Sequence, residues 1–418
     1  MSGTNLAAMA WRNLWRNRRR TLITLSSMAF GVMLAVLFTG LGDHTYGKMI
    51  DLAARSGGGH VTLQHPDMLV TPSLKRTVIG ASKLGDQALA DPEVERVATR
   101  ISGQALLATA RQSLGATFIA FDPGREDAST LSVLDALVEG EMFASTDDKG
   151  IILGARLADS LDTKLGRKVV FTMTDKSGEI VSQLARVQGI IETGAPSVDR
   201  GLCLLPLGRV RKALGYDPDE ATQVVVFLGD HRRSDVVAER VGAKVNHGTA
   251  SLPWHQLQPT LAGFISMKVG GTVFMELVIL VLVAAGIFNQ LLVSVLERLR
   301  EFGIMMAIGF SPGRLFRLVM WESLFLGVVG VVGGALLTAV PYYLGNTKGL
   351  DMSAMVGNAD GGSPEIAGVA LDPIMYVSIY PENAVLIAVV VIAATLLSGL
   401  YPAWRAGRVA PVDAIKLV

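Results

Sequence analysis

Long apolar runs interrupt a chain that is otherwise of mixed polarity. Four stretches carry almost no charged side chains: Leu22–Leu41, Gly271–Leu296, Leu318–Leu344 and Ala384–Trp404. About twenty apolar residues at a rise of 1.5 Å each cover the ~30 Å hydrocarbon core of a bilayer. Only helices and closed barrels satisfy their backbone groups in lipid, and runs of this length predict four transmembrane helices.

The region between the first two runs, residues 44–268, has the pattern of a water-soluble domain. Short segments rich in β-branched and aromatic residues recur there, bounded by glycine, proline and aspartate, and each predicts a strand. They are His60–Gln64, Ala116–Phe121, Lys168–Met173, Ala185–Ile191 and Gln223–Leu228. Helical patterns interrupt them at Ala155–Leu165 and Ser234–Val245. The predicted fold class is therefore membrane α-helical with a large α+β domain outside the membrane.

Basic residues indicate the orientation of the four helices. One cluster precedes the first helix, a second lies between the second and third, and a third follows the fourth. They are Arg12, Arg16, Arg18, Arg19, Arg20, Arg298, Arg300, Arg314, Arg317, Arg405, Arg408 and Lys416. With four spans these clusters share one side, which the positive-inside rule identifies as the cytoplasm. We expect both termini there, and residues 44–268 and 345–383 on the outer side.

The amino-terminal residues 1–20 predict an amphipathic helix at the cytoplasmic interface. Leu6, Met9, Ala10 and Leu14 recur at helical spacing, and the arginines suit lipid headgroups. A simple topogenic charge cluster is the alternative. The apolar stretch that follows is longer than the ~7–15 residues of a signal-peptide core and lacks a clear cleavage site, so we expect an uncleaved anchor.

Composition and motifs give no sign of an enzyme. The formal net charge of +1 gives no reason to expect a nucleic-acid partner. The single cysteine, Cys203, excludes an intrachain disulfide and is expected to be a buried thiol. Residues 44–268 contain neither HExxH nor GxSxG spacing, and the chain has no GxxxxGK[ST] phosphate loop. We expect no catalytic residue, cofactor or metal in this chain.

Two acidic residues stand inside the predicted membrane helices. Glu276 lies near the outer end of the second helix, and Glu322 lies near the inner end of the third. Placement at the level of the lipid headgroups explains both. An ion-coupled transporter would need charges near the midplane of several helices, and this pattern argues against one.

The segment Glu297–Arg317 is longer than a turn between two membrane helices requires. It predicts a short helix over Glu301–Ile308, ended by Gly309, with Ser311 as the N-cap of the next helix and proline at its first position. The apolar residues of the short helix would be poor choices for a solvated loop; they are Phe302, Ile304, Met305, Met306 and Ile308. We interpret them as an exposed docking surface for another protein. A helix that rests on lipid is the alternative.

These features together resemble a known family. The elbow at 297–317, followed by a glycine-rich third helix, resembles the FtsX/MacB-type permease domain of ABC transporters. The segment Tyr401–Lys416 is similar to the carboxy-terminal ending of that family, and Gly150–Ala158, Leu165–Val170 and Val187–Ile191 resemble its periplasmic core. An outward domain of this size on a chain without its own ATPase is most similar to the lipoprotein-releasing LolC/LolE-type permease subunits.

The resemblance implies a mechanical role. In this family the elbow is a coupling helix that docks on a cytoplasmic ATPase, and the matching residues here are Glu301, Phe302, Gly303, Ile304, Met305, Met306, Ala307, Ile308 and Gly309. ATP and Mg are expected in that separate ATPase dimer. The expected function is a permease subunit that couples ATP hydrolysis to periplasmic conformational change and extracts or releases lipoproteins from the bacterial inner membrane.

Other partners and two alternatives follow from the same resemblance. Gly330 and Gly334 form a small-xxx-small pair that lets helices approach closely, either in a dimer with a second or related permease or in packing within the chain. Membrane lipid, a lipoprotein or amphiphilic substrate and a periplasmic chaperone complete the expected partners. The alternative functions are efflux of an amphiphilic substrate and control of a periplasmic cell-wall enzyme.

The resemblance also implies a division of the chain. The interface helix at 1–20 and the first transmembrane helix at 21–43 precede a MacB-like periplasmic domain at 44–268. An FtsX-like permease domain follows at 269–418, with three transmembrane helices, a coupling helix near 298–310 and an outward loop at 345–383. Within this loop Ile374–Tyr380 alternates like a strand. The loop either packs on the outward domain or contacts a partner, or it is a disordered spacer.

Overall fold

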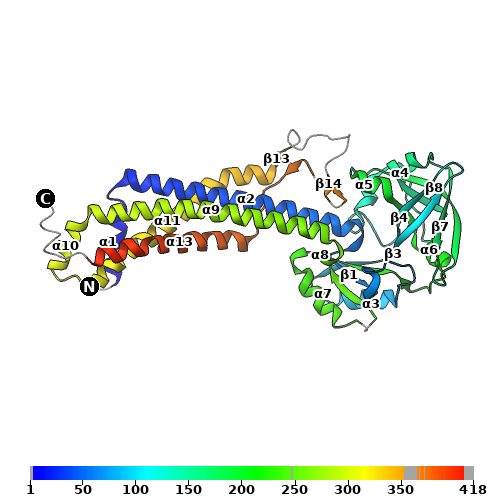
Figure 1. Ribbon diagram of the computed structural model, residues 1–418, viewed down its shortest axis with the longest axis horizontal. Coiled ribbons are helices and arrows are strands. Elements are labelled where there is room, and N and C mark those ends of the chain that lie inside the picture. The colour runs from blue at the N-terminus through cyan, green and yellow to red at the C-terminus, as the bar shows by residue number, and fades with distance from the viewer. Residues whose placement is uncertain (1–2, 246–247, 353–364, 367, 371, 409–418) are drawn as a thin grey trace. The chain divides into compact units, whose positions relative to one another are not determined.

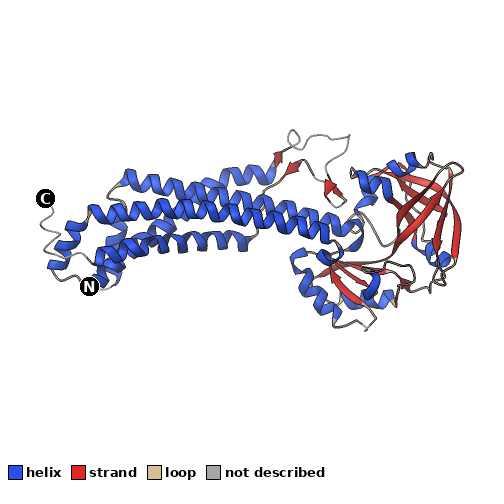
Figure 2. Ribbon diagram, in the orientation of Figure 1, coloured by secondary structure: helices blue, strands red, loops and turns tan. Residues whose placement is uncertain are grey.

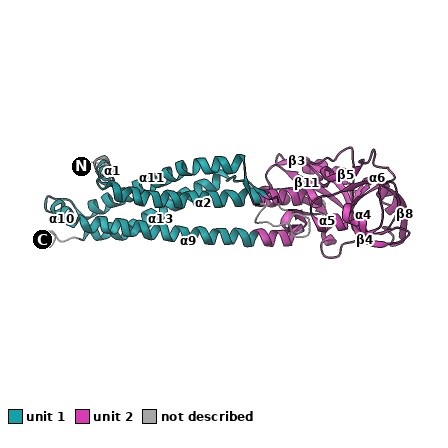
Figure 3. Ribbon diagram, turned by 90° about the horizontal axis from the view of Figure 1, so that it is seen from above, with its two compact units in different colours: residues 1–45, 266–351, 374–418 teal, residues 46–265, 352–373 magenta. Residues whose placement is uncertain are grey.

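The computed structural model describes residues 3–245, 248–352, 365–366, 368–370 and 372–408 (Figure 1). Long helices and strands separate into different parts of the chain (Figure 2). Two compact units result (Figure 3). The helical unit comprises residues 1–45, 266–351 and 374–418, and the strand-rich unit comprises residues 46–265 and 352–373.

The helical unit is built from long helices and two short ones. The helices are α1 (Gly3–Leu14), α2 (Arg18–Ala53), α9 (Pro259–Glu297), α10 (Leu299–Ala307), α11 (Pro312–Thr347) and α13 (Pro381–Gly407), and a two-residue strand β13 (Leu350–Asp351) pairs with β16 (Ile374–Met375). Four helices, α2, α9, α11 and α13, are long and apolar enough to cross a membrane. This finding confirms the four predicted spans.

Small residues bring the membrane helices together. Gly327 of α11 faces Thr395 of α13, and Gly399 of α13 faces Ser323 of α11. Such contacts let backbones approach closely where no hydrophobic effect drives association. Only 11% to 33% of the most apolar windows of the four helices is buried within the chain. So much exposed apolar surface would be unfavourable in water, and it suits contact with lipid.

The strand-rich unit contains one extended sheet with helices packed on it. In spatial order its strands are β12 (Ala250–Pro253), β1 (Val61–Gln64), β11 (Gln223–Leu228), β3 (Val94–Ala108), β4 (Ser113–Phe121), β9 (Leu202–Pro206), β6 (Gly150–Gly154), β8 (Ile180–Ile191) and β5 (Leu137–Gly140). A further strand, β7 (Lys168–Thr174), pairs with both β3 and β8. The strands β3, β4, β9, β6, β8 and β7 therefore close into a barrel.

One long strand belongs to both halves of this sheet. The first part of β3 pairs with β11, and this pairing ends where Arg100 lies opposite Gln223. The second part of β3 pairs with β4 from Ile101 onward. Near this crossing Gly59 has φ of +70° and lies against β11, where an added Cβ would come within 2.9 Å of the Val226 backbone. Glycine is required there because any side chain would push the two segments apart.

Short helices and strands complete the strand-rich unit. They are η1 (Ala54–Gly58), η2 (Pro66–Met68), β2 (Val78–Ile79), α3 (Ala81–Leu89), η3 (Ser132–Ala136), α4 (Ala155–Ser160), α5 (Pro196–Gly201), α6 (Leu207–Leu214), β10 (Glu220–Ala221), η4 (His231–Arg233), α7 (Ser234–Gly242), α8 (Trp254–Leu257), β14 (Glu365–Ile366) and β15 (Val369–Ala370). The unit has the predicted α+β content.

Each strand predicted in residues 44–268 overlaps an observed one, but two helix boundaries there and one strand boundary in the 345–383 loop were wrong. The helix expected over 155–165 ends at Ser160, because Asp162 adopts a left-handed φ of 47° that a helix cannot continue through. The helix expected over 234–245 ends at Gly242. In the segment 374–380, only Ile374–Met375 forms a strand, because only these two residues have a pairing partner, in β13.

The described part of the 345–383 loop contacts the rest of the chain within each unit. In the strand-rich unit, the Glu365 carboxylate accepts a hydrogen bond from the Ser197 N–H at 3.0 Å, and Lys48 pairs with Asp372 at 2.5 Å. In the helical unit, the Ser378 N–H donates to the Gly40 carbonyl at 2.9 Å. Glu365 and Asp372 thus pack on the strand-rich unit, as the first alternative expected, whereas Ser378 packs on the helical unit. Residues 353–364, 367 and 371 lie outside the description.

Candidate functional site: the α10 elbow and an apolar pocket

The elbow between α9 and α11 is built by local backbone signals. Helix α10 ends where Gly309 adopts φ of +100°, and the Gly309 and Phe310 N–H groups donate to the Met306 and Met305 carbonyls at 3.0 and 2.9 Å. This pair of bonds is a Schellman motif, which requires a left-handed residue after the helix. The sequence placed this glycine correctly. The elbow therefore has one defined turn between α10 and α11.

The start of α11 corrects one detail of the prediction. Ser311 occupies the N-cap and Pro312 the first helical position, but the Ser311 hydroxyl makes no capping hydrogen bond. Its carbonyl instead accepts from the N–H groups of Arg314 and Leu315 at 2.9 and 3.3 Å. The backbone alone starts the helix here, helped by the fixed φ of proline.

The expected exposure of Phe302 was wrong. Its ring is fully buried, and Gly303 beside it is buried as well. Phe302 packs in a cluster with residues of α1, α11 and α13, whose buried members include Ala10, Leu315, Leu318, Val319, Ala403 and Ala406. The inner face of α10 therefore anchors the elbow to the bundle.

The outer face of α10 retains an exposed apolar surface. Ile304 and Ile308 are 48% and 74% exposed, Ala307 and Gly309 are also exposed, and Met305 and Met306 are half-buried. We call Ile304, Ala307, Ile308 and Gly309 the elbow surface. Exposed apolar side chains on a short helix between two membrane helices suit contact with a protein or with lipid.

Polar and charged side chains link the elbow to α11 and to the segment at the end of α1. Arg16 donates to Glu301, and Arg298 donates to Glu301 at 3.2 Å and to Glu322 at 3.0 Å. Asn13 donates to the same Glu322 carboxylate at 2.8 Å. We call these five residues the elbow network. Glu322 is buried and paired within this network, which accounts for a carboxylate inside an apolar helix.

A second set of bonds fixes the end of α9 beside the network. Arg20 of α2 donates to the Gln290 side chain at 2.7 Å and forms an ion pair with Glu297 at 2.7 Å. The hydrogen bond from Arg16 lowers the pKa of Glu301 below its ordinary value, and Arg298 adds to this effect. The elbow is thus held by polar and charged side chains from α1, the turn after it, α2, α9 and α11.

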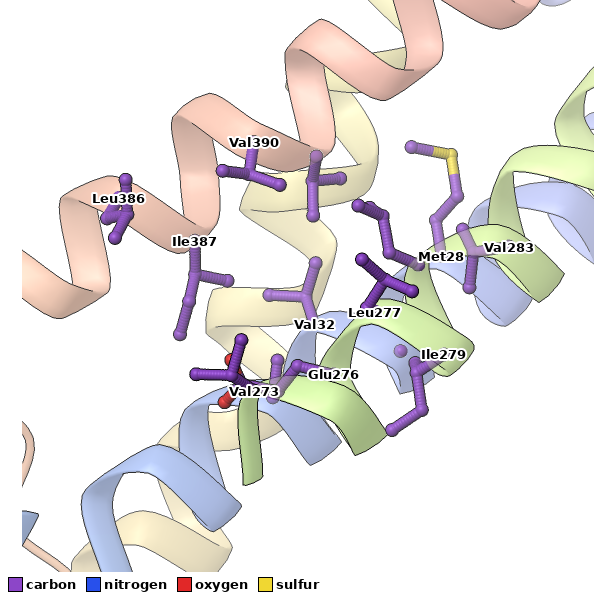
Figure 4. Close-up of a pocket in the computed structure, with 14 residues that line it drawn as sticks. Met28, Val32, Val273, Glu276, Leu277, Ile279, Val283, Leu386, Ile387 and Val390 are labelled. Carbon is purple, nitrogen blue, oxygen red and sulfur yellow. The ribbon is translucent and has the colours of Figure 1, made fainter. Parts of the chain in front are cut away.

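An apolar pocket lies between α2, α9 and α13, and the sequence gave no direct signal of it. Figure 4 shows the side chains that line it, and its volume is about 280 Å³. Its walls are apolar side chains such as Val32, Leu277 and Val390, and Glu276 is the one charged residue among them. The Glu276 carboxylate accepts a hydrogen bond from Thr39. An apolar cavity with one polar end fits an amphiphilic ligand.

The two candidate helix-packing glycines lie inside the helical unit. An added Cβ on Gly330 would meet Met28 of α2, and one on Gly334 would meet Val32 of the same helix. Both glycines are buried. The structure thus gives them the intrachain packing that was one of the two alternatives.

Two further reactive side chains, His60 and Cys203, are buried in the strand-rich unit. The His60 Nδ1 accepts from the Leu228 N–H at 3.0 Å, which leaves the proton on Nε2, 3.0 Å from Asp51. Cys203 is fully buried, as predicted, and burial raises the pKa of its thiol to about 12. Among the described residues, no group of three His, Cys, Asp or Glu side chains is arranged to hold a metal ion.

Comparison with protein families covers most of the chain. The profile of the MacB-like periplasmic core domain matches residues 21–244, and that of the FtsX-like permease C-terminal domain matches residues 273–411. These matches confirm the resemblance drawn from the sequence motifs. The part of the carboxy-terminal motif at 409–416 lies outside the described structure.

Individual relatives are similar at low identity. The lipoprotein-releasing system transmembrane protein LolC of Xylella fastidiosa is 26% identical over 355 residues, covering 79% of this chain and 79% of that protein. The ABC transporter permease YtrF of Bacillus subtilis is 31% identical over 154 residues, covering 37% of this chain and 33% of that protein. The periplasmic region of MacB from Actinobacillus actinomycetemcomitans matches with 12% identity and a TM-score of 0.35, covering 51% of this chain and 98% of that structure.

Proposed function

The chain belongs to the FtsX/MacB family of ABC transporter permeases, and on that premise we propose that it passes ATP-driven motion from a cytoplasmic ATPase to its periplasmic domain. ATP and Mg bind to the partner ATPase, and this chain contributes no catalytic group. Two permease chains, identical or related, assemble with the ATPase dimer. Both termini lie in the cytoplasm of a bacterium, and the strand-rich unit lies outside its inner membrane.

The elbow is the observation that carries this proposal. Its buried face and the elbow network fix α10 to α1 and α11, while the elbow surface stays exposed. A rigid lever with an exposed apolar contact is what an ATPase needs to move membrane helices. The basic residues around it support a cytoplasmic position, since the positive-inside rule favours that side for them.

Serine at Ile304 and Ile308 is expected to separate the chain from its ATPase. Burying one isoleucine contributes about 1.5–3 kcal/mol, and 1.4 kcal/mol is a tenfold change in binding. The double variant Ile304→Ser with Ile308→Ser should therefore lower the ATP hydrolysis that co-purifies with the tagged chain at least tenfold. The thermal midpoint of the purified chain should stay unchanged because both side chains are exposed.

A matched control removes the same kind of surface elsewhere. Val138 and Ile180 of the strand-rich unit are 55% and 78% exposed, so Val138→Ser with Ile180→Ser changes as much apolar surface away from the elbow. This control should keep the co-purifying ATPase activity. Equal activity in the elbow variant and the control would show that the elbow does not contact the ATPase.

The apolar pocket supports an amphiphilic substrate, with lipoproteins as the proposed cargo. Its walls accept an acyl chain, and the Glu276 and Thr39 pair provides a polar end for the attached head. A periplasmic chaperone then receives the released lipoprotein. Binding in a pocket between membrane helices lets a motion of α2, α9 or α13 expel the acyl chain.

Filling this pocket should block acyl-chain binding. Ala35 lines the cavity, so the ring of Ala35→Phe occupies part of its roughly 280 Å³. We expect at least tenfold weaker binding of a fluorescent fatty-acid probe to the detergent-purified chain. The matched variant Ala335→Phe adds the same ring at an exposed position of α11 and should bind the probe normally. Equal binding by both variants would place the acyl site elsewhere.

A further inference from the structure

A groove in the strand-rich unit gathers positive charge. It is formed by the turn between β3 and β4, the loop between α4 and β7, and strand β8, and its volume is about 630 Å³. Five basic side chains line it: Arg111, Lys164, Arg167, Lys168 and Arg186. Asp162 is the one acidic residue in its lining. We call this site the basic groove.

Most of these cations lack a carboxylate partner. Asp162 pairs with Arg111. Lys164, Arg167, Lys168 and Arg186 form no ion pair within the described part of the chain, although Arg186 donates to the Gly166 carbonyl at 2.8 Å. Like charges held together repel one another, and a bound anion removes that repulsion. The formal net charge of the whole chain is only +1, so the groove is a local concentration of charge.

A buried hydroxyl in the same groove also lacks a partner. Thr163 is only 7% exposed, and its Oγ1 makes no hydrogen bond to any described residue. Thr163 lines the groove between Asp162 and Lys164. Buried polar groups are nearly always satisfied, so an unsatisfied one beside a cavity is available to a water, an ion or a ligand atom. The ligand should therefore accept a hydrogen bond as well as carry negative charge.

We propose that the basic groove binds a phosphoryl-bearing anion. Three of the five cations are arginines, whose planar guanidinium groups bind phosphate oxygens in pairs. A phosphoryl group carries up to two charges and three acceptor oxygens, enough for arginine and the Thr163 hydroxyl together. The phosphoryl group belongs to a free phosphate ion or to a phosphorylated head group of the cell envelope. This site is separate from the elbow and the apolar pocket.

Calorimetric titration of the full chain in detergent tests this assignment. The probes are inorganic phosphate, tripolyphosphate, glycerol phosphate and poly-glutamate. We expect a phosphoryl probe to bind more weakly as salt is raised, because the groove is open to solvent. Tightest binding of inorganic phosphate identifies the free ion, and tightest binding of tripolyphosphate or glycerol phosphate identifies an esterified or chain ligand. Both results support the proposal.

Charge-preserving variants distinguish phosphate recognition from simple attraction. Arg167→Lys with Arg186→Lys keeps the charge and removes the paired donors, so the phosphoryl probe should bind at least tenfold more weakly. The control Lys83→Ala with Lys244→Ala removes two exposed charges elsewhere in this unit and should bind normally. Equal affinity for poly-glutamate, unaffected by the lysine variants, would overturn the proposal in favour of an acidic protein partner.

The hydroxyl of Thr163 provides a separate test. Thr163→Val removes an unpartnered buried hydroxyl, so the unliganded chain should unfold at the same temperature or higher. The phosphoryl probe should nevertheless bind about tenfold more weakly, because a hydrogen bond to a charged group is lost. Unchanged affinity in this variant, or no binding of any phosphoryl probe to the unaltered chain, would exclude the site.

Discussion

Replacing Glu126 with alanine should destabilise the strand-rich unit by about 3–5 kcal/mol. Glu126 pairs with Arg100, and the two side chains are 1% and 0% exposed. The Arg100 Nε donates to both carboxylate oxygens at 3.1 Å, and its Nη atoms donate to the Gly57 and Thr130 carbonyls at 2.8 Å. Glu126→Ala would leave a buried guanidinium without its counter-charge.

The position of this pair makes the effect large. Arg100 stands where β3 leaves its pairing with β11 and begins its pairing with β4. The guanidinium also lies 5.8 Å from the centre of the Phe227 ring on β11. Loss of the counter-charge therefore destabilises the point at which the open sheet and the barrel share a strand. The stability of both parts of the sheet should decrease.

Pulse proteolysis of the full chain in detergent over a urea series measures this change. The exposed pair between Lys212 and Asp147 is 74% and 53% exposed, so Asp147→Ala should cost less than about 1 kcal/mol. The double variant Arg100→Met with Glu126→Leu should cost less than Glu126→Ala, because it leaves no unpaired charge. A cost for Glu126→Ala no greater than that for Asp147→Ala would contradict the role assigned to the pair.

Hydropathy was enough to find the membrane helices because the bilayer imposes a length and a composition on each of them. Strand propensity likewise located β1, β4, β7, β8 and β11. The closure of the barrel was beyond prediction, because it depends on β7 joining two strands, β3 and β8, and no local pattern specifies a strand's neighbours. The ion pair of Arg100 and Glu126 could not be predicted from the sequence either, since each residue alone resembles an ordinary surface charge.

The elbow shows the same limit at the level of a side chain. The location of the elbow and the glycine that ends α10, Gly309, could be predicted because turn signals depend on neighbouring residues alone. Which face of α10 is buried depends on α11 and α13, so Phe302 was assigned to the exposed surface. The network residues were also missed, because Asn13 and Glu322 are 309 residues apart in the chain. Two signals in the sequence could have indicated the network. One is Glu322, a carboxylate inside an apolar run, and the other is the pair Arg16 and Arg298, which lie just before α2 and α10.

Alanine at Gly334 should destabilise the helical unit by about 1–3 kcal/mol. A Cβ at this position would lie 2.6 Å from the Val32 Cβ and 2.7 Å from its Cγ1, and 3.3 Å from the Ala29 carbonyl oxygen. The Cβ of Val32 is fixed by its own backbone, so no rotation of that side chain relieves the contact. Helices α2 and α11 must move apart, and the gain in helix propensity from alanine, about 1 kcal/mol, offsets only part of the cost.

Two neighbouring glycines of α11 give a graded comparison. At Gly330 the nearest atoms belong to the flexible end of Met28, at 2.6 and 3.0 Å, so Gly330→Ala should cost less than Gly334→Ala. At Gly333 the nearest atom is the Ala29 Cβ at 3.8 Å, an ordinary contact. Gly333→Ala should therefore be neutral or slightly stabilising, since alanine favours the helix.

Thermal unfolding of the three variants in detergent, together with their oligomeric state, decides between the two roles considered for these glycines. Packing within the chain predicts the order Gly334→Ala, Gly330→Ala, Gly333→Ala from most to least destabilising, with no change in oligomeric state. Val32→Gly removes the atom that the new methyl group meets, so it should cost less in the Gly334→Ala background than alone. A dimer contact would give the opposite result, with assembly lost, the protomer's midpoint unchanged and no rescue by Val32→Gly.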